Sequence, residues 1–340
     1  MSDEPRDCES ILAHSASAIR PLIRSQVNHL PAHIRHITGM HFGWWTDDRI
    51  HLDRPAEGKA LRPALALLAC QAVGGDPEQA RLAAVAVELI HNASLLHDDI
   101  IDHDPVRRHR PALWAAKGIP AAILAGDALF FAAVQALTEA PRAEHTIPIL
   151  LESVQQLIEG EYLDTLLETG TDVSEDRALS VAAGKTAELL ACACALGATA
   201  GGADAERVGH LRAFGRHLGI AFQCVDDLLG IWGDEQITGK PALSDLRRRK
   251  VSLPVASAMA GHTPQGDALR ALYRGNTPPS EQECRHAAEL IEQSGARVRT
   301  LQRALRHSAD ARERLALSRP APVAAAELAT LAEMISRRDH

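Results

Sequence analysis

The sequence predicts an all-α protein. Hydrophobic residues make up 46% of its 340 residues but aromatic residues only 3%, so the core must be built from alanine, leucine, isoleucine and valine. Alanine and leucine are strong helix formers. No convincing alternating strand pattern and no internal repeat appear, and the linker-like stretches at residues 234–243, 261–266 and 275–279 are short. We therefore expect a single domain over residues 1–340, with a disordered tail over residues 1–9.

Helices are expected where apolar residues recur at helical spacing. The first covers residues 10–30 and stops near Pro31, and residues 33–53 are expected to be irregular. A helix from Arg62 to Val73 ends at a pair of glycines, and Pro77 starts the helix that leads to a first cluster of aspartates. Further helices are expected at residues 121–138, 148–169, 178–197, 206–229, 255–260, 279–307 and 324–338.

Charge and composition exclude several classes of protein. The net charge of −8 gives no reason to expect nucleic acid as a partner. The acidic N-terminus, MSDEPRDCES, does not resemble a signal peptide, and no run of 18 apolar residues predicts a transmembrane segment. The six cysteines lack zinc-type spacing, and we expect reduced thiols in a cytoplasmic protein.

The stretch LLHDDIIDHDPVRRHRPA, residues 95–112, is the strongest indication of chemistry. Asp98 and Asp102 are four residues apart and share one face of a helix, with their Cβ atoms about 6 Å apart. Like charges at this spacing repel each other, and the apolar residues before them predict a largely buried helix. Crowded carboxylates of this kind favour Mg²⁺, which prefers oxygen ligands and shares its coordination shell with phosphates. For an isolated DDxxD pattern, a solvated acidic helix end would be the more common outcome.

A second aspartate pair decides between these alternatives. Asp226 and Asp227 follow another apolar helical run, in FQCVDDLLGIWGD. If the two helices face each other across a bundle, the two clusters can hold several Mg²⁺ ions between them. Such a metal site suits a diphosphate.

In their order, the motifs of the chain resemble those of the trans-isoprenyl (polyprenyl) diphosphate synthase family. The resemblance covers residues 58–254 and includes GKALRP, LIHNASLLHDDIID, RRHRPA, ILAGD, GEYLD, KT, FQCVDD, GK and DLRRRKVSLP. It implies the isoprenoid synthase fold, an antiparallel helical bundle around a central cavity, and a homodimer. It also implies that an allylic diphosphate ionises to a carbocation and pyrophosphate, that isopentenyl diphosphate attacks the cation, and that a proton is lost.

In such a reaction catalysis consists largely of stabilising the charge on the departing pyrophosphate. The resemblance implies three Mg²⁺ ions, two bound by Asp98 and Asp102 and one by Asp226, with Asp99 and Asp227 orienting or supplementing these ligands. The allylic diphosphate would contact Arg107, Lys185, Lys240 and Lys250, with Thr186 and Gln223 nearby. Isopentenyl diphosphate would be held by Lys59, Arg62, His91 and Arg108. Lys185 is also a cation in an otherwise apolar helix, where an unpaired lysine would be costly.

The sequence departs from the family pattern at three places. Gly230 stands where a third carboxylate usually follows the second aspartate pair, His109 replaces a glycine, and Glu161 replaces a glutamine. We expect water to replace the missing carboxylate, so that Gly230→Asp would leave activity intact or improve it.

The residues one helical turn before the first aspartate cluster set product length in this family. Here they are Ala93 and Ser94, both small, so the product should be longer than fifteen carbons. The next bulky candidates are a turn or more deeper, or come from the following helices, where Phe130 and Phe131 lie. This pattern resembles geranylgeranyl diphosphate synthases (twenty carbons), with farnesyl or longer polyprenyl products as alternatives.

Two further alternatives belong to other functional classes. A terpene cyclase or lyase on the same fold would not use isopentenyl diphosphate, but the residues expected to bind that substrate are intact. A non-catalytic partner subunit typically lacks metal-binding carboxylates, whereas this chain keeps five of the six expected.

Overall fold

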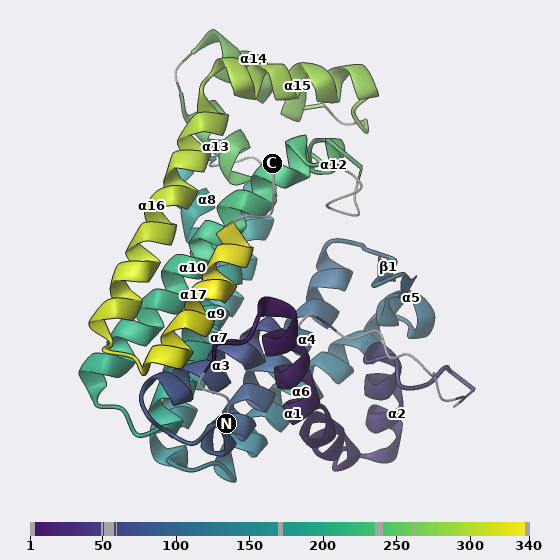
Figure 1. The fold of residues 1–340 in the computed structure, drawn as a ribbon. Coiled ribbons are helices and arrows are strands. Elements are labelled where there is room, and N and C mark those ends of the chain that lie inside the picture. The colour runs from purple at the N-terminus through teal and green to yellow at the C-terminus, as the bar shows by residue number, and fades with distance from the viewer. Residues whose placement is uncertain are drawn as a thin grey trace. The chain divides into compact units, whose positions relative to one another are not determined.

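The structure is a computed structural model that describes residues 4–48, 50, 58, 60–168, 173–234, 241–261, 263–275 and 277–336, without the side chain of Ser336. Within these ranges, the regular elements are helices apart from one short hairpin (Figure 1). The all-α prediction is therefore confirmed.

The chain forms two compact units, each made of several segments. The first unit comprises residues 1–152, 192–209 and 318–328, and the second comprises residues 153–191, 210–317 and 329–340. The expectation of a single domain stays a prediction, and the two units are described in turn.

The first unit is built around the buried helix α4 (Arg81–Ile101), in which residues 83–90 are at most 9% exposed. Helices α1 and α3 pack against it, and α6 runs along it. The elements that begin in this unit are α1 (Cys8–Asn28), α2 (Ala32–His41), α3 (Leu61–Ala72), η1 (Pro77–Ala80), α4, β1 (Val106–Arg107), β2 (Arg110–Pro111), α5 (Leu113–Lys117), α6 (Ile119–Thr138) and α7 (Ala143–Glu168).

The described part of the N-terminus is tied to the first unit. The side chain of Asp7 accepts a hydrogen bond from the backbone of Ser10 and caps α1. The guanidinium of Arg6 donates two hydrogen bonds of 2.8 and 2.7 Å to the carboxylate of Glu327. A disordered tail was expected to reach residue 9, but Cys8 and Glu9 form the first turn of α1. Residues 1–3 lie outside the described part of the chain.

Helix α2 corrects the expectation of an irregular stretch from residue 33. Its glycine, Gly39, is buried, and a Cβ atom there would lie 2.5 Å from Cε2 of Trp45. Glycine weakens the helical pattern of a sequence, but here the packing of the indole ring requires it. Residues 42–48 and Ile50 belong to no helix, as expected, whereas Arg49 and residues 51–53 of that stretch lie outside the described residues.

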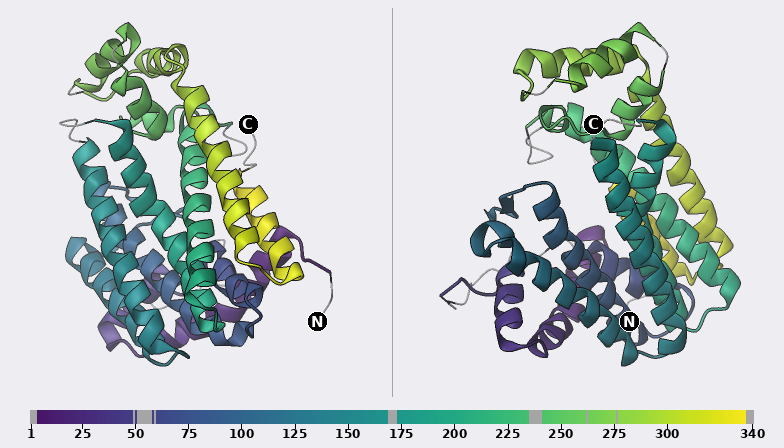
Figure 2. Two further views of the ribbon diagram at one scale, coloured as in Figure 1. Left: turned by 90° about the vertical axis from the view of Figure 1, so that its left-hand side faces the viewer. Right: turned by 180° about the vertical axis from the view of Figure 1, so that it is seen from behind.

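The second unit holds the longest helices of the described chain. Figure 2 shows α16 (Ala296–Leu317) running beside α10 (Ala205–Trp232), which enters this unit at His210. The other elements represented here are α8 (Glu175–Val181), η2 (Ala182–Ala187), α9 (Glu188–Ala200), α12 (Ser244–Arg247), α13 (Leu253–Ala260), α14 (Pro264–Tyr273), α15 (Glu281–Gln293) and α17 (Pro322–Ser336), with the last part of α7.

Helices α14, α15 and α16 of the second unit differ from the predicted boundaries. The single helix expected at residues 279–307 is divided into α15 and α16 at Gly295, whose φ of 74° ends a helix. Helix α14 begins at Pro264, within the expected linker, where the side chain of Thr263 caps it. These breaks depend on single residues that interrupt or restart a helical pattern.

A buried carboxylate joins three helices of the second unit. Glu188 is 1% exposed and accepts hydrogen bonds from Ser153 of α7 and from Arg212 and Arg216 of α10, at 2.9, 3.0 and 2.9 Å. Burying a charge is costly unless it is paired and hydrogen-bonded. The arginines and the serine satisfy this requirement and link α7 and α10 to the start of α9.

Two helical stretches, residues 119–138 and 175–200, are long and apolar enough to cross a membrane when judged by length and composition alone. The apolar window of the second is 72% buried within the protein, as in the core helix of a soluble protein. The window in α6 is 44% buried, and it leaves Leu124 and Phe131 exposed.

We predict that Gly197→Ala destabilises the first unit. A Cβ atom at Gly197 would lie 2.7 Å from the carbonyl carbon of Ala66 in α3, so the two backbones would have to separate. The expected loss is about 3 kcal/mol of unfolding free energy, measured by chemical denaturation.

Gly209→Ala is the matched control, because no atom lies within 4 Å of a Cβ atom at that helical position. It should gain about 0.5–1 kcal/mol. Equal effects of the two substitutions would contradict the close approach of α9 and α3.

Candidate active site

The first aspartate cluster lies at the C-terminal end of α4. Asp98 and Asp102 are on one face of the helix, while Asp99 is 1% exposed. Arg107 bridges the cluster, since its Nη2 lies 3.1 Å from Oδ2 of Asp98 and its Nε donates a 2.7 Å hydrogen bond to Oδ1 of Asp99. Burial raises the pKa of Asp99, and the hydrogen bond from Arg107 opposes that shift.

Arg107 reaches the carboxylates because the chain reverses in a tight hairpin. Strands β1 and β2 pair with Arg107 opposite Arg110, so Arg108 and His109 form a two-residue turn. Their φ angles of 51° and 60° are those of a type I′ turn, which favours glycine. The replacement of glycine by His109 therefore leaves the turn intact with a side chain in the left-handed region.

These carboxylates fit Mg²⁺. Asp98 and Asp102 offer hard oxygen donors on one face, and Oδ2 of Asp99 is a buried acceptor without a hydrogen-bond donor among the described residues. Magnesium keeps several water ligands, so a cluster that opens at a helix end suits it better than a closed cage.

Three of the four residues expected to hold isopentenyl diphosphate belong to the described part of the first unit. Burial lowers the pKa of His91 well below its usual value, and the positive charges of Arg62 and Arg108 lower it further. His91 is thus a neutral imidazole beside two cations, which can donate a hydrogen bond to a phosphate oxygen. Lys59 lies outside the described residues.

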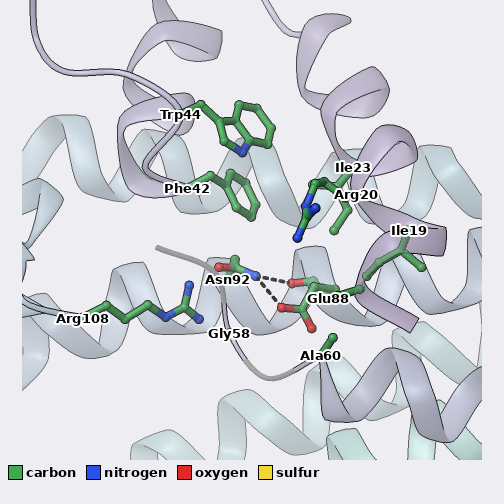
Figure 3. A pocket seen from close by; sticks show the side chains of 11 residues that line it. Ile19, Arg20, Ile23, Phe42, Trp44, Gly58, Ala60, Glu88, Asn92 and Arg108 are labelled. Atoms are coloured by element: carbon green, nitrogen blue, oxygen red, sulfur yellow. Dashed lines mark hydrogen bonds between the residues drawn. The ribbon is translucent and has the colours of Figure 1, made fainter. Parts of the chain in front are cut away.

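A small cavity of about 50 Å³ lies beside Arg108 (Figure 3). One of the residues that line it, Glu88, was not among the site residues predicted from the sequence. Glu88 belongs to α4 and is 9% exposed. Its Oε1 accepts a hydrogen bond of 3.2 Å from Nδ2 of Asn92, whose Oδ1 lies 3.1 Å from Nε2 of His41. Glu88 also opposes the lowering of the pKa of Arg62 by burial. A lone acid within the apolar run of α4 was the available sequence signal.

A second cavity in the same unit has a volume of about 310 Å³ and a cationic lining. Arg107, Arg108 and Arg110 line it together with His41, and one acid, Asp47, also contributes to the lining. Burial and then Arg108 lower the pKa of His41 to about 4. Such a lining is complementary to an anion.

The second aspartate pair lies on α10 in the second unit. Asp227 is 3% exposed and accepts hydrogen bonds from Nε2 of Gln223 at 2.7 Å and from the backbone of Leu253 at 2.8 Å. Burial raises the pKa of Asp227 to about 6, although Lys250 opposes the shift. Asp226 is half-buried on the same helix. Both oxygens of Asp227 are engaged, so it supports the site from within, whereas Asp226 is the more exposed of the two.

Lys185 is held by two carboxylates of α7. Its Nζ lies 3.1 Å from Oε1 of Glu161 and 2.8 Å from Oδ2 of Asp164. It belongs to the π-helical turn η2, a distortion that is frequent at functional sites. Glu161 replaces the usual glutamine but still accepts a hydrogen bond from the lysine.

The remaining expected residues of this unit gather around the same carboxylates. Thr186 donates a 2.6 Å hydrogen bond to Oε1 of Gln223. Burial lowers the pKa of Lys250, but Asp227, Asp245 and two other aspartates outweigh it and leave the pKa raised. Lys250 is therefore a firmly charged cation. Lys240 lies outside the described residues.

The structure corrects the expectation for Gly230. A Cβ atom at this position would lie 2.5 Å from Cγ of Asp245, so the carboxylate of Asp245 occupies the space of the missing side chain. An acidic group is thus retained there from α12 instead of being replaced by water. The sequence contained Asp245 as the first residue of DLRRRKVSLP, but only the contact between α12 and α10 reveals its place.

Comparison with known proteins identifies the family. Residues 51–291 match the polyprenyl synthetase family. The chain belongs to this family. It is 42% identical to the (2E,6E)-farnesyl diphosphate synthase of Mycobacterium tuberculosis, over 96% of this chain and 92% of that protein. It is 38% identical to the geranylgeranyl diphosphate synthase of the same organism, over 97% of this chain and 94% of that protein.

A solved structure shows the same fold. The crystal structure of a polyprenyl synthetase from Streptomyces coelicolor matches with a TM-score of 0.91 and 39% identity, over 97% of this chain and 99% of that chain. The protein is therefore a trans-prenyltransferase. Enzymes of this family join an allylic diphosphate to isopentenyl diphosphate.

We predict that Asp245→Ala lowers prenyl transfer at limiting Mg²⁺ and that Gly230→Asp also impairs it, since the new side chain displaces Asp245 and adds a like charge. The double variant Gly230→Asp/Asp245→Ala should recover activity, because it restores one carboxylate to one space. Initial rates against Mg²⁺ concentration measure this. A double variant no better than either single one would show that Asp245 does not replace the missing carboxylate.

Proposed function

We propose that the protein is a Mg²⁺-dependent synthase of all-trans geranylgeranyl diphosphate, a product of twenty carbons. The small residues one turn before Asp98 carry this proposal. Ser94 shares a face of α4 with Asp98, and its short side chain donates a 2.8 Å hydrogen bond from the hydroxyl to the backbone of His91. Ala93 is completely buried. No aromatic ring stands at either position to stop chain growth early.

Helix α6 carries the two bulky candidates for the end of the tunnel, Phe130 and Phe131. The ring of Phe130 lies 5.7 Å from that of His97, measured between centroids. His97 packs onto Gly126, where a Cβ atom would lie 2.6 Å from its Cδ2. Phe131, the other bulky candidate, is 77% exposed and does not line the interior of this unit. Of the two bulky candidates, Phe130 is therefore the one proposed to end the tunnel.

The proposed roles follow the charges of each unit. Asp98 and Asp102 would hold two Mg²⁺ ions and Asp226 a third, with Asp99, Asp227 and Asp245 in support. Bound magnesium supplies positive charge to the departing pyrophosphate. Arg107, Lys185, Lys240 and Lys250 would bind the same diphosphate, with Thr186 and Gln223 as neighbours. Lys59, Arg62, His91 and Arg108 would orient isopentenyl diphosphate for attack.

We further propose a cytoplasmic homodimer. Helix α6 exposes Ile123, Leu124 and Phe131, an apolar face that a second copy would cover. Size-exclusion chromatography with light scattering tests this assignment.

Farnesyl diphosphate is the second candidate product, because the 42% identical relative is named for it. Incubation with Mg²⁺, isopentenyl diphosphate and each allylic primer in turn, followed by mass spectrometry of the products, decides between them. Products of twenty carbons support the proposal, and termination at fifteen would overturn it. Turnover of an allylic diphosphate without isopentenyl diphosphate would instead indicate a cyclase.

We predict that Asp98→Asn lowers turnover at least about 100- to 1000-fold, the scale on which loss of one group that stabilises a developing charge acts. Asp104→Asn, in the same segment but without an assigned role, serves as the control and should stay within a fewfold of wild type. Steady-state kinetics at saturating Mg²⁺ measure both. Near-normal turnover of Asp98→Asn would defeat the metal assignment.

We also predict that Ser94→Phe shortens the product toward fifteen carbons, because an aromatic ring one turn before Asp98 blocks the tunnel. Ser94 is half-buried, so the larger side chain is easier to accommodate there than at the fully buried Ala93. Gln302→Phe at an exposed position of α16 is the control and should leave product length unchanged. An unchanged spectrum for Ser94→Phe would place the limit elsewhere.

A further inference from the structure

A cluster of metal-binding side chains lies in the second unit, apart from the residues assigned to the reaction. It consists of His217 on α10 and of His307 and Asp310 on α16. The Nδ1 atoms of the two histidines are 2.9 Å apart, and Nδ1 of His217 lies 3.7 Å from Oδ2 of Asp310. One ligand atom from each residue lies within 4.8 Å of the others.

The two helices bring these side chains together in a fixed way. His307 and Asp310 are three residues apart and therefore neighbours on one face of α16. α10 runs beside α16 (Figure 2) and contributes His217, whose Nδ1 lies 2.9 Å from that of His307. The rings lie 5.2 Å apart between centroids and are tilted by 35°. The convergence thus rests on packed helices rather than on a loop.

The cluster has the electrostatics of a ligand set. Burial lowers the pKa of both histidines, with further lowering of the pKa of His307 by His217. Asp310 opposes the shift in both. Neutral imidazole is the form that coordinates a metal. Asp310 remains half-exposed, which leaves the cluster open to solvent and to an ion.

The distance between the histidines also fits an ion. Two imidazole nitrogens bound to Zn²⁺ at about 2.0–2.1 Å in tetrahedral geometry are about 3.3 Å apart. The two Nδ1 atoms would have to separate by only a few tenths of an ångström, which side-chain rotation allows. In the contact between the two Nδ1 atoms, one nitrogen carries a proton and donates it to the other. Binding of the metal ion would displace that proton from Nδ1 and replace this hydrogen bond.

We propose that His217, His307 and Asp310 form a binding site for a first-row transition-metal ion, with Zn²⁺ as the expected occupant and water completing its shell. Two imidazoles and one carboxylate suit such an ion, whereas Mg²⁺ prefers oxygen ligands. The ion would link α10 to α16. Because α10 also carries Gln223, Asp226 and Asp227, the site would stabilise the helix that presents the second aspartate pair.

The test uses the full chain without an affinity tag, at saturating Mg²⁺ so that the aspartate clusters of the active site are occupied. Zn²⁺ binding is measured by competition with a chromophoric chelator and by metal content after dialysis. Wild type should bind one Zn²⁺ per chain, and its melting temperature should rise with Zn²⁺. His217→Gln and His307→Gln should each lower the affinity more than tenfold and abolish the thermal shift.

His286→Gln is the matched control. His286 also lies near a carboxylate on its own helix, with Nδ1 3.7 Å from Oε2 of Glu289, but no second histidine from another helix faces it among the described residues. This variant should bind Zn²⁺ like wild type. Circular dichroism confirms that each variant is folded. Zn²⁺ binding that is equal in wild type and the His217 variant, or absent from wild type, would overturn the proposal.

A Co²⁺ spectrum adds a readout that does not depend on stability. Co²⁺ bound by two imidazoles and a carboxylate gives visible absorption bands. Added Mg²⁺ should leave these bands unchanged, because it prefers oxygen ligands and does not displace Co²⁺ from imidazoles. These bands should appear in wild type and the His286 variant and be lost in the His307 variant. Displacement of the bands by Mg²⁺ would assign the ion to the aspartate clusters and contradict the proposed site.

Discussion

The contact between Arg107 and the aspartates at the end of α4 is the constraint on which the first unit depends. Asp98 and Asp99 stand at the end of a helix buried over most of its length, and burial alone would favour protonation of Asp99. Arg107 reaches both carboxylates only because the hairpin turns within two residues, Arg108 and His109. The same turn brings Arg108 to the cavity beside Glu88 (Figure 3). One hairpin therefore places Arg107 at the aspartates and Arg108 at this cavity.

The second unit balances its charges by a different route. Asp227 is held by an amide side chain and a backbone N–H, and Lys250 is charged because several aspartates surround it. Lys185 is paired in turn with Glu161 and Asp164. A diphosphate that approached either lysine would compete with carboxylates already in place. Metal ions bound together with a diphosphate would add positive charge beside these carboxylates and so would reduce this competition.

Much of this arrangement could be predicted from the sequence, because helical periodicity and the ordered motifs are local signals. The rest depends on contacts between residues remote in sequence. Gly39 interrupts the helical sequence pattern of α2 because the indole ring of Trp45 leaves no room for a side chain there. The carboxylates that pair with Lys185 come from another helix. The place of Asp245 beside Gly230 is of the same kind. No spacing rule reports such contacts.

The three departures from the family pattern bear on whether the chain has left the family's reaction. Each has a local compensation: Asp245 occupies the space beside Gly230, His109 adopts the left-handed conformation of the glycine it replaces, and Glu161 still accepts a hydrogen bond from Lys185. A chain drifting toward a different chemistry would be under no requirement to keep a carboxylate, a turn and an acceptor at these positions. The carboxylate, the turn and the hydrogen-bond acceptor are all kept although the residues differ. This favours prenyl transfer over a cyclase or a non-catalytic subunit.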